Sequence, residues 1–79
     1  MVVRFAPAFQ RSVRRFKRGP QRDAFANLLR KIITNPAAGK PMRYGRKGTR
    51  EVYLGPYRIA YEVEGEIITF LEAYHKDEQ

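Results

Sequence analysis

Residues 50–74 read REVYLGPYRIAYEVEGEIITFLEAY, and this stretch decides the fold. It contains runs rich in β-branched and aromatic residues, which are typical of β-strands. The runs are residues 50–54, 57–63 and 66–74. The turn pairs Gly55-Pro56 and Glu64-Gly65 separate them, and strands joined by such short turns pair in antiparallel fashion. The sequence therefore predicts a three-stranded antiparallel meander.

Side chains alternate between the two faces of a strand, and this alternation assigns the faces of the meander. The set expected to face the core is Val52, Leu54, Tyr57, Ile59, Tyr61 and Val63. The opposite face then carries Glu51, Tyr53, Arg58 and Ala60. A buried charge without a partner is strongly penalised. This second face is therefore open to water, or Arg58 forms a cross-strand ion pair with Glu51 or Glu62.

The residues before the meander predict a strand and a first helix. Residues 2–6 (VVRFA) form the candidate strand. Pro7 suits the first position of a helix, and Phe9, Val13 and Phe16 follow it at helical spacing. The helix ends before the next glycine and proline.

Gly19-Pro20 separates this helix from a second one, which we expect to begin at Pro20. The apolar side of the second helix consists of Phe25, Leu28, Leu29, Ile32 and Ile33. It ends at Asn35-Pro36, because the residue before a proline avoids the helical conformation. The loop that follows has room for a short edge strand at residues 42–44.

The predicted fold is an α+β domain spanning residues 1–79, with the element order β-α-α-β-β-β. A helical hairpin packs on one face of a small antiparallel sheet. At 79 residues the core is small, so a stabilising partner is plausible. The chain has no cysteine. It shows no apolar run long enough to span a membrane, and its first residues lack the apolar stretch of a signal peptide. We expect a cytoplasmic protein.

The charge of the chain is unevenly distributed. The formal net charge is +8, but residues 1–50 hold fourteen Lys and Arg and one acid, whereas residues 51–79 hold two bases and seven acids. A basic field of this kind attracts polyanions through phosphate neutralisation and counterion release. Nucleic acid is therefore the expected partner class. The alternative is a solubilising surface without a specific ligand.

Three segments carry a resemblance to a known family. They are NPAAGKPMR (residues 35–43), GPYRIAYEV (residues 55–63) and LEAYHKDEQ (residues 71–79). Together with the element order, they resemble the RelE, YoeB and HigB toxins over nearly the whole chain. The resemblance implies a RelE-like fold and a ribonuclease without a metal or other cofactor, usually cutting mRNA in the ribosomal A site. It also implies an acidic antitoxin that wraps the toxin.

The resemblance assigns residues as well. Arg58 corresponds to the third-strand arginine that contacts the scissile phosphate, and Tyr74-His75 to a Tyr-His ending in which the histidine is an acid or a base. Two lysines in the second strand of RelE are replaced here by Thr49 and Glu51. The loop glutamate of YoeB falls near Met42, so Glu51 is the substitute candidate for a carboxylate base.

RNA cleavage by its own 2′-hydroxyl needs a base, a proton donor and positive charge beside the phosphate. A histidine titrates near neutrality, and an arginine offers a planar fork of donors to phosphate oxygens. The catalytic candidates are Arg58, His75, Glu51 and Tyr74, with Arg58 and His75 expected in one groove. The RNA-binding candidates are Arg46, Lys47, Arg50, Tyr53 and Lys76. The sequence has one histidine, no cysteine and no acidic cluster, so we expect no metal site.

Two other functions stay open at this point. The ParE toxins, which inhibit DNA gyrase, share the fold and often the third-strand arginine, so a non-nuclease toxin is one alternative. The other is an RNA-binding member of the family that has lost its activity, which the missing lysines and loop glutamate favour.

Overall fold

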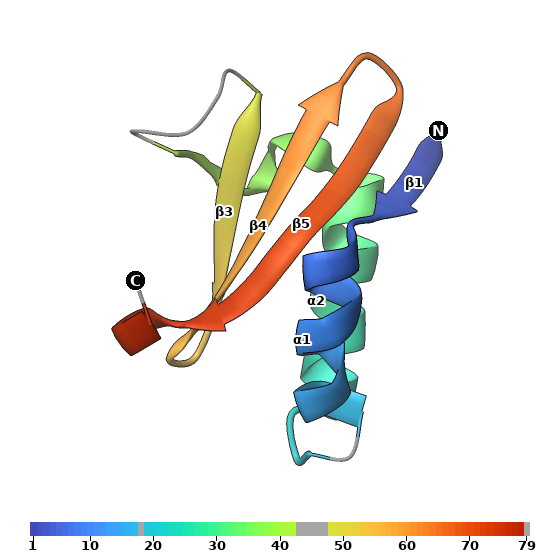
Figure 1. The fold of residues 1–79 in the computed structure, drawn as a ribbon. Helices are drawn as coiled ribbons and strands as arrows, with labels where there is room; N and C mark the ends of the chain where they lie inside the picture. Colours follow the sequence, from blue (N-terminus) through green and yellow to red (C-terminus); the bar gives the residue numbers. More distant parts are fainter. Residues whose placement is uncertain (18, 43–47, 79) are drawn as a thin grey trace.

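The computed structural model of the chain describes residues 1–17, 19–42 and 48–78. Figure 1 shows two helices beside a twisted sheet. The strands are β1 (Val2–Phe5), β2 (Lys40–Pro41), β3 (Thr49–Leu54), β4 (Tyr57–Glu64) and β5 (Ile67–His75). The helices are α1 (Pro7–Lys17) and α2 (Arg22–Thr34), with short 3-10 helices η1 (Pro36–Ala38) and η2 (Lys76–Glu78). The predicted element order is confirmed, with β2 added before the meander. None of the helices in the described ranges is long and apolar enough to cross a membrane.

A single five-stranded sheet runs in the order β1-β5-β4-β3-β2, and both helices cover the same face of it (Figure 1). Strands β3, β4 and β5 pair in antiparallel fashion, as predicted. β1 instead lies parallel to β5, with Val2 opposite Ile67, so the sheet is mixed. The expectation of a wholly antiparallel sheet is corrected on this point, because the apolar pattern of a strand carries no information on its direction.

Helix α1 begins at Pro7 as expected and lies against β5. Phe9 and Phe16 are its buried aromatic side chains. Ser12 adds a polar contact, because its Oγ accepts a hydrogen bond from the backbone amide of Ala73 at 3.1 Å. The apolar spacing and this single hydrogen bond together fix the helix on the sheet.

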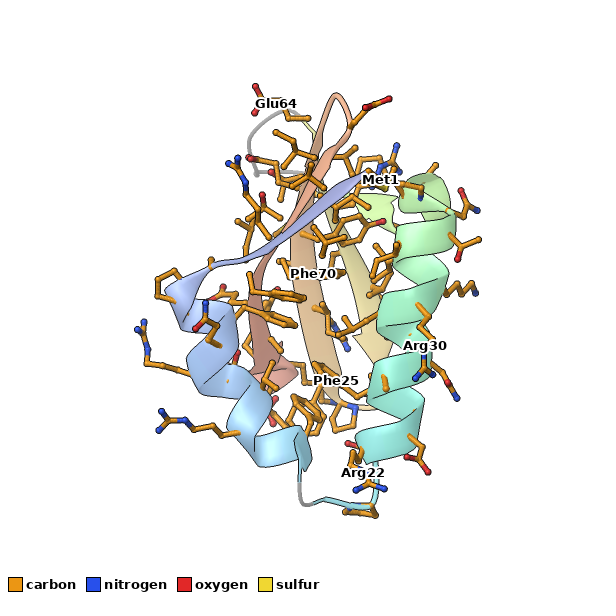
Figure 2. All side chains as sticks on the ribbon, turned by 90° about the vertical axis from the view of Figure 1, so that its right-hand side faces the viewer. Met1, Arg22, Phe25, Arg30, Glu64 and Phe70 are labelled. Carbon is orange, nitrogen blue, oxygen red and sulfur yellow. The ribbon has the colours of Figure 1, made fainter. Side chains whose placement is uncertain are left out.

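Helix α2 begins at Arg22, so the prediction that Pro20 opens it is wrong by two residues, because Pro20 lies in a turn. Figure 2 shows Phe25 of α2 and Phe70 of β5 in the layer between the helices and the sheet, whereas Arg30 points away from that layer. The helix thus has one apolar and one basic side.

The core predicted by alternation is confirmed. The residues Val52, Leu54, Tyr57, Ile59, Tyr61 and Val63 all belong to the core cluster or pack against it. Aromatic rings fill much of this core, with the centroids of Phe16 and Phe25 4.4 Å apart and those of Phe9 and Phe70 5.3 Å apart.

One buried hydroxyl locks the segment after α2 to the sheet. The Tyr61 hydroxyl donates to the Pro36 carbonyl at 2.7 Å and accepts from the Gly39 amide at 2.9 Å. Arg50 in turn donates to the Gly39 carbonyl at 2.7 Å. A Cβ atom on Gly39 would lie 2.7 Å from the Tyr61 hydroxyl oxygen, so a larger residue does not fit without movement. The chain is thereby led into β2 along the edge of β3.

Two local expectations need correction. The edge strand expected at residues 42–44 is β2 at Lys40–Pro41, and residues 43 and 44 lie outside the described part of the chain. The turn between β4 and β5 is Gly65-Glu66, not Glu64-Gly65, because Glu64 still pairs with Ile67. Gly65 takes a φ of 59°, a conformation that glycine adopts without strain.

Candidate functional site

The face of the sheet turned away from the helices, here called the open face, carries the polar residues of the meander. On β3, Glu51 and Tyr53 alternate with core residues. On β4, Arg58, Ala60 and Glu62 do the same. The alternation seen in the sequence therefore gives this face correctly for β3 and β4.

Strand β5 contains a bulge that changes its alternation. Ala60 pairs with Glu72 but the next residue, Tyr61, pairs with Phe70, so Leu71 is an extra residue on β5. Phe70 faces the core before the bulge, and Ala73 faces it afterwards. The bulge keeps the charged Glu72 out of the core, where it would lack a partner. The signal in the sequence is the spacing of three between the polar residues Thr69 and Glu72, where a regular strand has two.

Because of the bulge, Tyr74 reaches the open face. Tyr53, Arg58 and Tyr74 lie directly opposite one another on β3, β4 and β5. We call these three residues the tyrosine–arginine row. The Arg58 guanidinium carbon lies 4.0 Å from the centroid of the Tyr53 ring, a cation–π contact. Its remaining contacts are long hydrogen bonds to the carbonyls of Gly55 and Tyr57, at 3.5 and 3.4 Å.

The ion-pair alternative for Arg58 is not what the structure shows. Among the described residues, the contacts of Arg58 include no ion pair with Glu51 or Glu62, and the guanidinium packs on Tyr53 instead. The charge therefore lies on a partly exposed surface, beside groups that leave several of its donors available for a ligand.

Glu51 and Tyr74 form a second contact on the open face. The Tyr74 hydroxyl donates to Glu51 Oε2 at 2.5 Å, a distance typical of a hydrogen bond to a charged oxygen. Because Tyr74 belongs to β5 and Glu51 to β3, the Tyr74 side chain must cross β4 to make this bond. Ala60, the direct partner of Glu51 on β4, is only 4% exposed. The small side chain at Ala60 thus makes room for the bond.

His75 lies on the other face. It pairs with Tyr57, and the two rings meet edge to face with centroids 5.3 Å apart. Its Nδ1 accepts a hydrogen bond from the Asp77 amide at 3.2 Å. The expectation that Arg58 and His75 share one groove is therefore wrong, because the bulge places Tyr74 beside Arg58 and turns the next side chain away.

The other predicted RNA-binding residues are dispersed. Arg50 faces the helices and is engaged with the Gly39 carbonyl, so it does not point to the open face. Lys76 begins η2, whose first amide donates to the Pro56 carbonyl at 2.8 Å and holds the end of the chain beside the β3–β4 turn. Arg46 and Lys47 lie outside the described residues.

Carboxylates occupy the part of the open face beyond the tyrosine–arginine row. Glu51 and Glu72 flank Ala60 in the next row, and Glu62 follows on β4. The exposed basic side chains of the described residues fall into two groups. Arg11, Arg14, Arg22, Arg30 and Lys31 belong to the helices or to the segment between them, whereas Arg4, Lys40 and Lys76 belong to β1, β2 and η2. Lys40 pairs with Glu51 at the edge of the sheet. Within residues 1–17, 19–42 and 48–78, no group of three or more acidic or histidine side chains is placed to hold a metal ion.

A groove of about 570 Å³ separates the two helices near β1. Its floor is apolar and is formed by Phe5, Phe9, Val13, Phe25 and Leu29. Arg11 and Arg14 also line it. Phe5 is 46% exposed there, so its ring adds apolar surface to the groove.

Residues 3–79 match the family model of the ParE toxin of the type II toxin–antitoxin system, parDE. The chain belongs to the ParE toxin family. It is thus a type II toxin of the RelE/ParE superfamily, as the sequence resemblance predicted. Comparison with curated protein sequences gives no match.

Solved structures share the fold of this ParE-family toxin. The Escherichia coli DinJ–YafQ complex matches with a TM-score of 0.82 at 15% identity, covering 96% of this chain and 93% of the other. The RelB–RelE antitoxin–toxin complex of Methanococcus jannaschii gives 0.73 at 21% identity, with 95% and 92% covered. The chromosomal ParDE system of Pseudomonas aeruginosa gives 0.64 at 18% identity, with 95% of both chains covered. The predicted RelE-like α+β fold is confirmed.

Proposed function

We propose that the toxin is a metal-independent endoribonuclease that cleaves ribosome-bound mRNA at the tyrosine–arginine row. The observation that carries the proposal is the placement of Arg58 between two tyrosines, one of which is hydrogen-bonded to a carboxylate. A guanidinium can bind phosphate oxygens, and aromatic rings can stack on unpaired bases. The carboxylate and the phenol supply a route for a proton.

The proposed reaction uses three side chains. The 2′-oxygen of one ribose attacks the adjacent phosphorus, and the bond from phosphorus to the 5′-oxygen of the next nucleotide breaks. The Tyr74 oxygen takes the 2′-hydroxyl proton. At the same time the Tyr74 hydroxyl passes its own proton to Glu51, which already accepts a hydrogen bond from it. Arg58 stabilises the charge that develops on the phosphate oxygens. The leaving oxygen takes a proton from water, and the products are a 2′,3′-cyclic phosphate and a 5′-hydroxyl.

In this scheme His75 supports the end of β5, where its ring packs on Tyr57, and has no part in proton transfer. The His75→Gln variant is therefore expected to retain most of the cleavage activity. The sequence hypothesis of a catalytic histidine requires instead a loss of about 10²- to 10⁴-fold. The two assignments differ by enough to be separated in one assay.

The test is the cleavage of mRNA on ribosomes and of free single-stranded RNA, with cleavage ends mapped after a short induction in cells. Arg58→Ala should lower cleavage about 10²- to 10³-fold, and Tyr74→Phe, which cannot pass a proton, about 10²-fold or more. Arg30→Ala is the control, because Arg30 is an exposed arginine on the other side of the molecule. Intact mRNA and normal translation after induction of the unaltered chain would refute the proposal.

A second function is favoured by the family that the chain belongs to, ParE. In that case the toxin binds a protein target such as DNA gyrase and cleaves no RNA. The carboxylates that share the open face with Arg58 are consistent with a protein ligand, since they repel phosphates. Inhibition of purified gyrase in a supercoiling assay, with Tyr74→Phe still fully toxic, would establish this function in place of the first.

The proposed partner is an acidic antitoxin, because each of the similar toxin structures above belongs to a toxin–antitoxin system. We place its contact in the groove between α1 and α2, where Arg11 and Arg14 stand beside an apolar floor. An amphipathic helix with an apolar face and acidic edges fits this combination. Binding should also stabilise the fold, by about 2.7 kcal/mol at a free antitoxin concentration of 100 times the dissociation constant.

The antitoxin contact is tested with the product of the adjacent gene. The complex should melt above the isolated toxin, and Phe5→Asp should weaken binding measured by calorimetry. The control is Ala37→Asp, at an exposed position of η1 outside the groove. Equal affinities of the two variants would place the antitoxin elsewhere, and equal melting temperatures for the free and the complexed toxin would contradict the stabilisation.

A further inference from the structure

The tyrosine–arginine row runs across the strands, at right angles to their direction. Tyr53, Arg58 and Tyr74 are direct partners on three neighbouring strands. Neighbouring strands are about 4.8 Å apart, so the Cα atoms of the two tyrosines are roughly 9–10 Å apart with the arginine midway. A phosphate bound by Arg58 would therefore lie between the backbone positions of two tyrosines, within reach of the Tyr53 ring that the guanidinium covers and of the Tyr74 side chain that crosses β4.

Each ring is already held in place. Arg58 packs on one face of Tyr53, and yet 52% of Tyr53 is exposed. The Tyr74 hydroxyl is fixed by Glu51, so its side chain is held across β4. A ring that is held before binding loses little side-chain entropy when a base stacks on it.

The path along the strands is blocked by charge. The row next to the tyrosine–arginine row holds Glu51 and Glu72 on either side of Ala60, about 7 Å away along β4 by strand geometry, and its one basic member, Lys40, lies beyond Glu51 on the edge strand β2. A strand of RNA that followed β4 would carry its next phosphate toward these carboxylates, and like charges repel. A strand that crossed the sheet would keep its phosphates in the row of Arg58.

We propose that single-stranded RNA crosses the sheet along the tyrosine–arginine row, so that the toxin holds one dinucleotide step. This inference rests on the proposed nuclease function. The base on the 5′ side of the scissile phosphate stacks on Tyr74, because the 2′-hydroxyl that attacks belongs to that nucleotide and must meet the Tyr74 oxygen. The base on the 3′ side stacks on Tyr53. Paired bases cannot reach the rings, so duplex RNA is excluded.

The experiment combines variants of the toxin with abasic substrates. A short RNA carries a 2′-deoxynucleotide at its cleavage site, which prevents reaction, and dissociation constants are measured at one fixed salt concentration. Tyr53→Leu should weaken binding by about 5- to 150-fold, the value of one base–aromatic stack. Removing the 3′ base should erase this penalty, whereas removing the 5′ base should leave it. For Tyr74→Leu, removing the 5′ base should erase the binding penalty, whereas removing the 3′ base should leave it.

Conservative variants separate stacking from damage to the fold. Tyr53→Phe keeps the ring and should bind as the unaltered toxin does. Tyr74→Phe should also bind normally while losing cleavage, a split that a purely structural role would not give. A penalty for Tyr53→Leu that is the same with intact and abasic RNA would overturn the crossing path while leaving the nuclease function in place. Failure of the unaltered toxin to cut RNA would instead refute the function itself.

Discussion

Replacing Tyr61 by phenylalanine is the sharpest test of the packing that builds the site. The ring stays in a fully buried position, and only the hydroxyl is removed. The Gly39 amide loses its acceptor at 2.9 Å and the Pro36 carbonyl loses its donor at 2.7 Å. A buried polar group left without a partner costs about 1–3 kcal/mol. We therefore expect Tyr61→Phe to lower the free energy of unfolding by about 2–6 kcal/mol, the sum for the two groups.

The assay is urea unfolding followed by circular dichroism, in which the midpoint should fall and the m-value should stay constant. For a domain of this size the melting temperature should drop by about 8 °C or more. Tyr53→Phe is the matched control, because it removes a hydroxyl from a largely exposed tyrosine. A loss for Tyr61→Phe of no more than the control would refute the role assigned to the buried hydroxyl.

The pH dependence of stability gives a second readout for the same residue. Burial raises the pKa of the Tyr61 hydroxyl above its ordinary value of 10.0, although the Gly39 amide and Arg50 act to lower it. The unfolded chain therefore ionises first as the pH rises. The stability that Tyr61 contributes is fully present below pH 10 and is lost as the pH rises further. The difference between the unaltered toxin and Tyr61→Phe should accordingly shrink above pH 10.

Three further substitutions test other contacts. Gly39→Ala places a Cβ atom 2.7 Å from the Tyr61 hydroxyl oxygen. Chemical denaturation should show that it lowers the free energy of unfolding by about 1–3 kcal/mol, whereas the control Ala38→Ser, at an exposed position, should not lower it. Ser12→Ala removes the acceptor of the Ala73 amide and should cost about 1–3 kcal/mol; an unchanged unfolding midpoint would mean that α1 is held by its apolar side alone. Ala60→Leu should displace the Tyr74 ring and lower RNA cleavage about 10²-fold while the domain stays folded, whereas Ala60→Ser should cleave normally.

Helical spacing and turn residues were enough to predict the order of the elements, and alternation of side chains was enough to predict the faces of β3 and β4. It placed the core residues of β3 and β4 correctly and put Arg58 on the opposite face. This succeeded because a strand with one buried face must repeat every two residues. The direction of β1 was not predictable in the same way, since a short apolar strand looks alike in either direction.

The site was harder to predict than the fold. The sequence drew attention to Arg58, Glu51, Tyr53 and Tyr74, and the structure brings these four together; their catalytic and binding roles stay predictions. His75 was assigned to the same groove because nothing in its immediate neighbours shows which way it faces. The face on which His75 lies is set by the bulge at Leu71, four residues upstream, where the alternation of β5 changes.

The bulge at Leu71 decides which side chains of β5 reach the open face. Without the bulge, Leu71 would pair with Ala60, Tyr74 would turn toward the helices and His75 would face outward past the end of β4. The charge on Glu72 opposes this arrangement, because Glu72 would then lie opposite the buried Ile59. An apolar residue at position 72 would remove that penalty. A single substitution at position 72 would thus turn the phenol of Tyr74 away from the open face and bring the imidazole of His75 onto it.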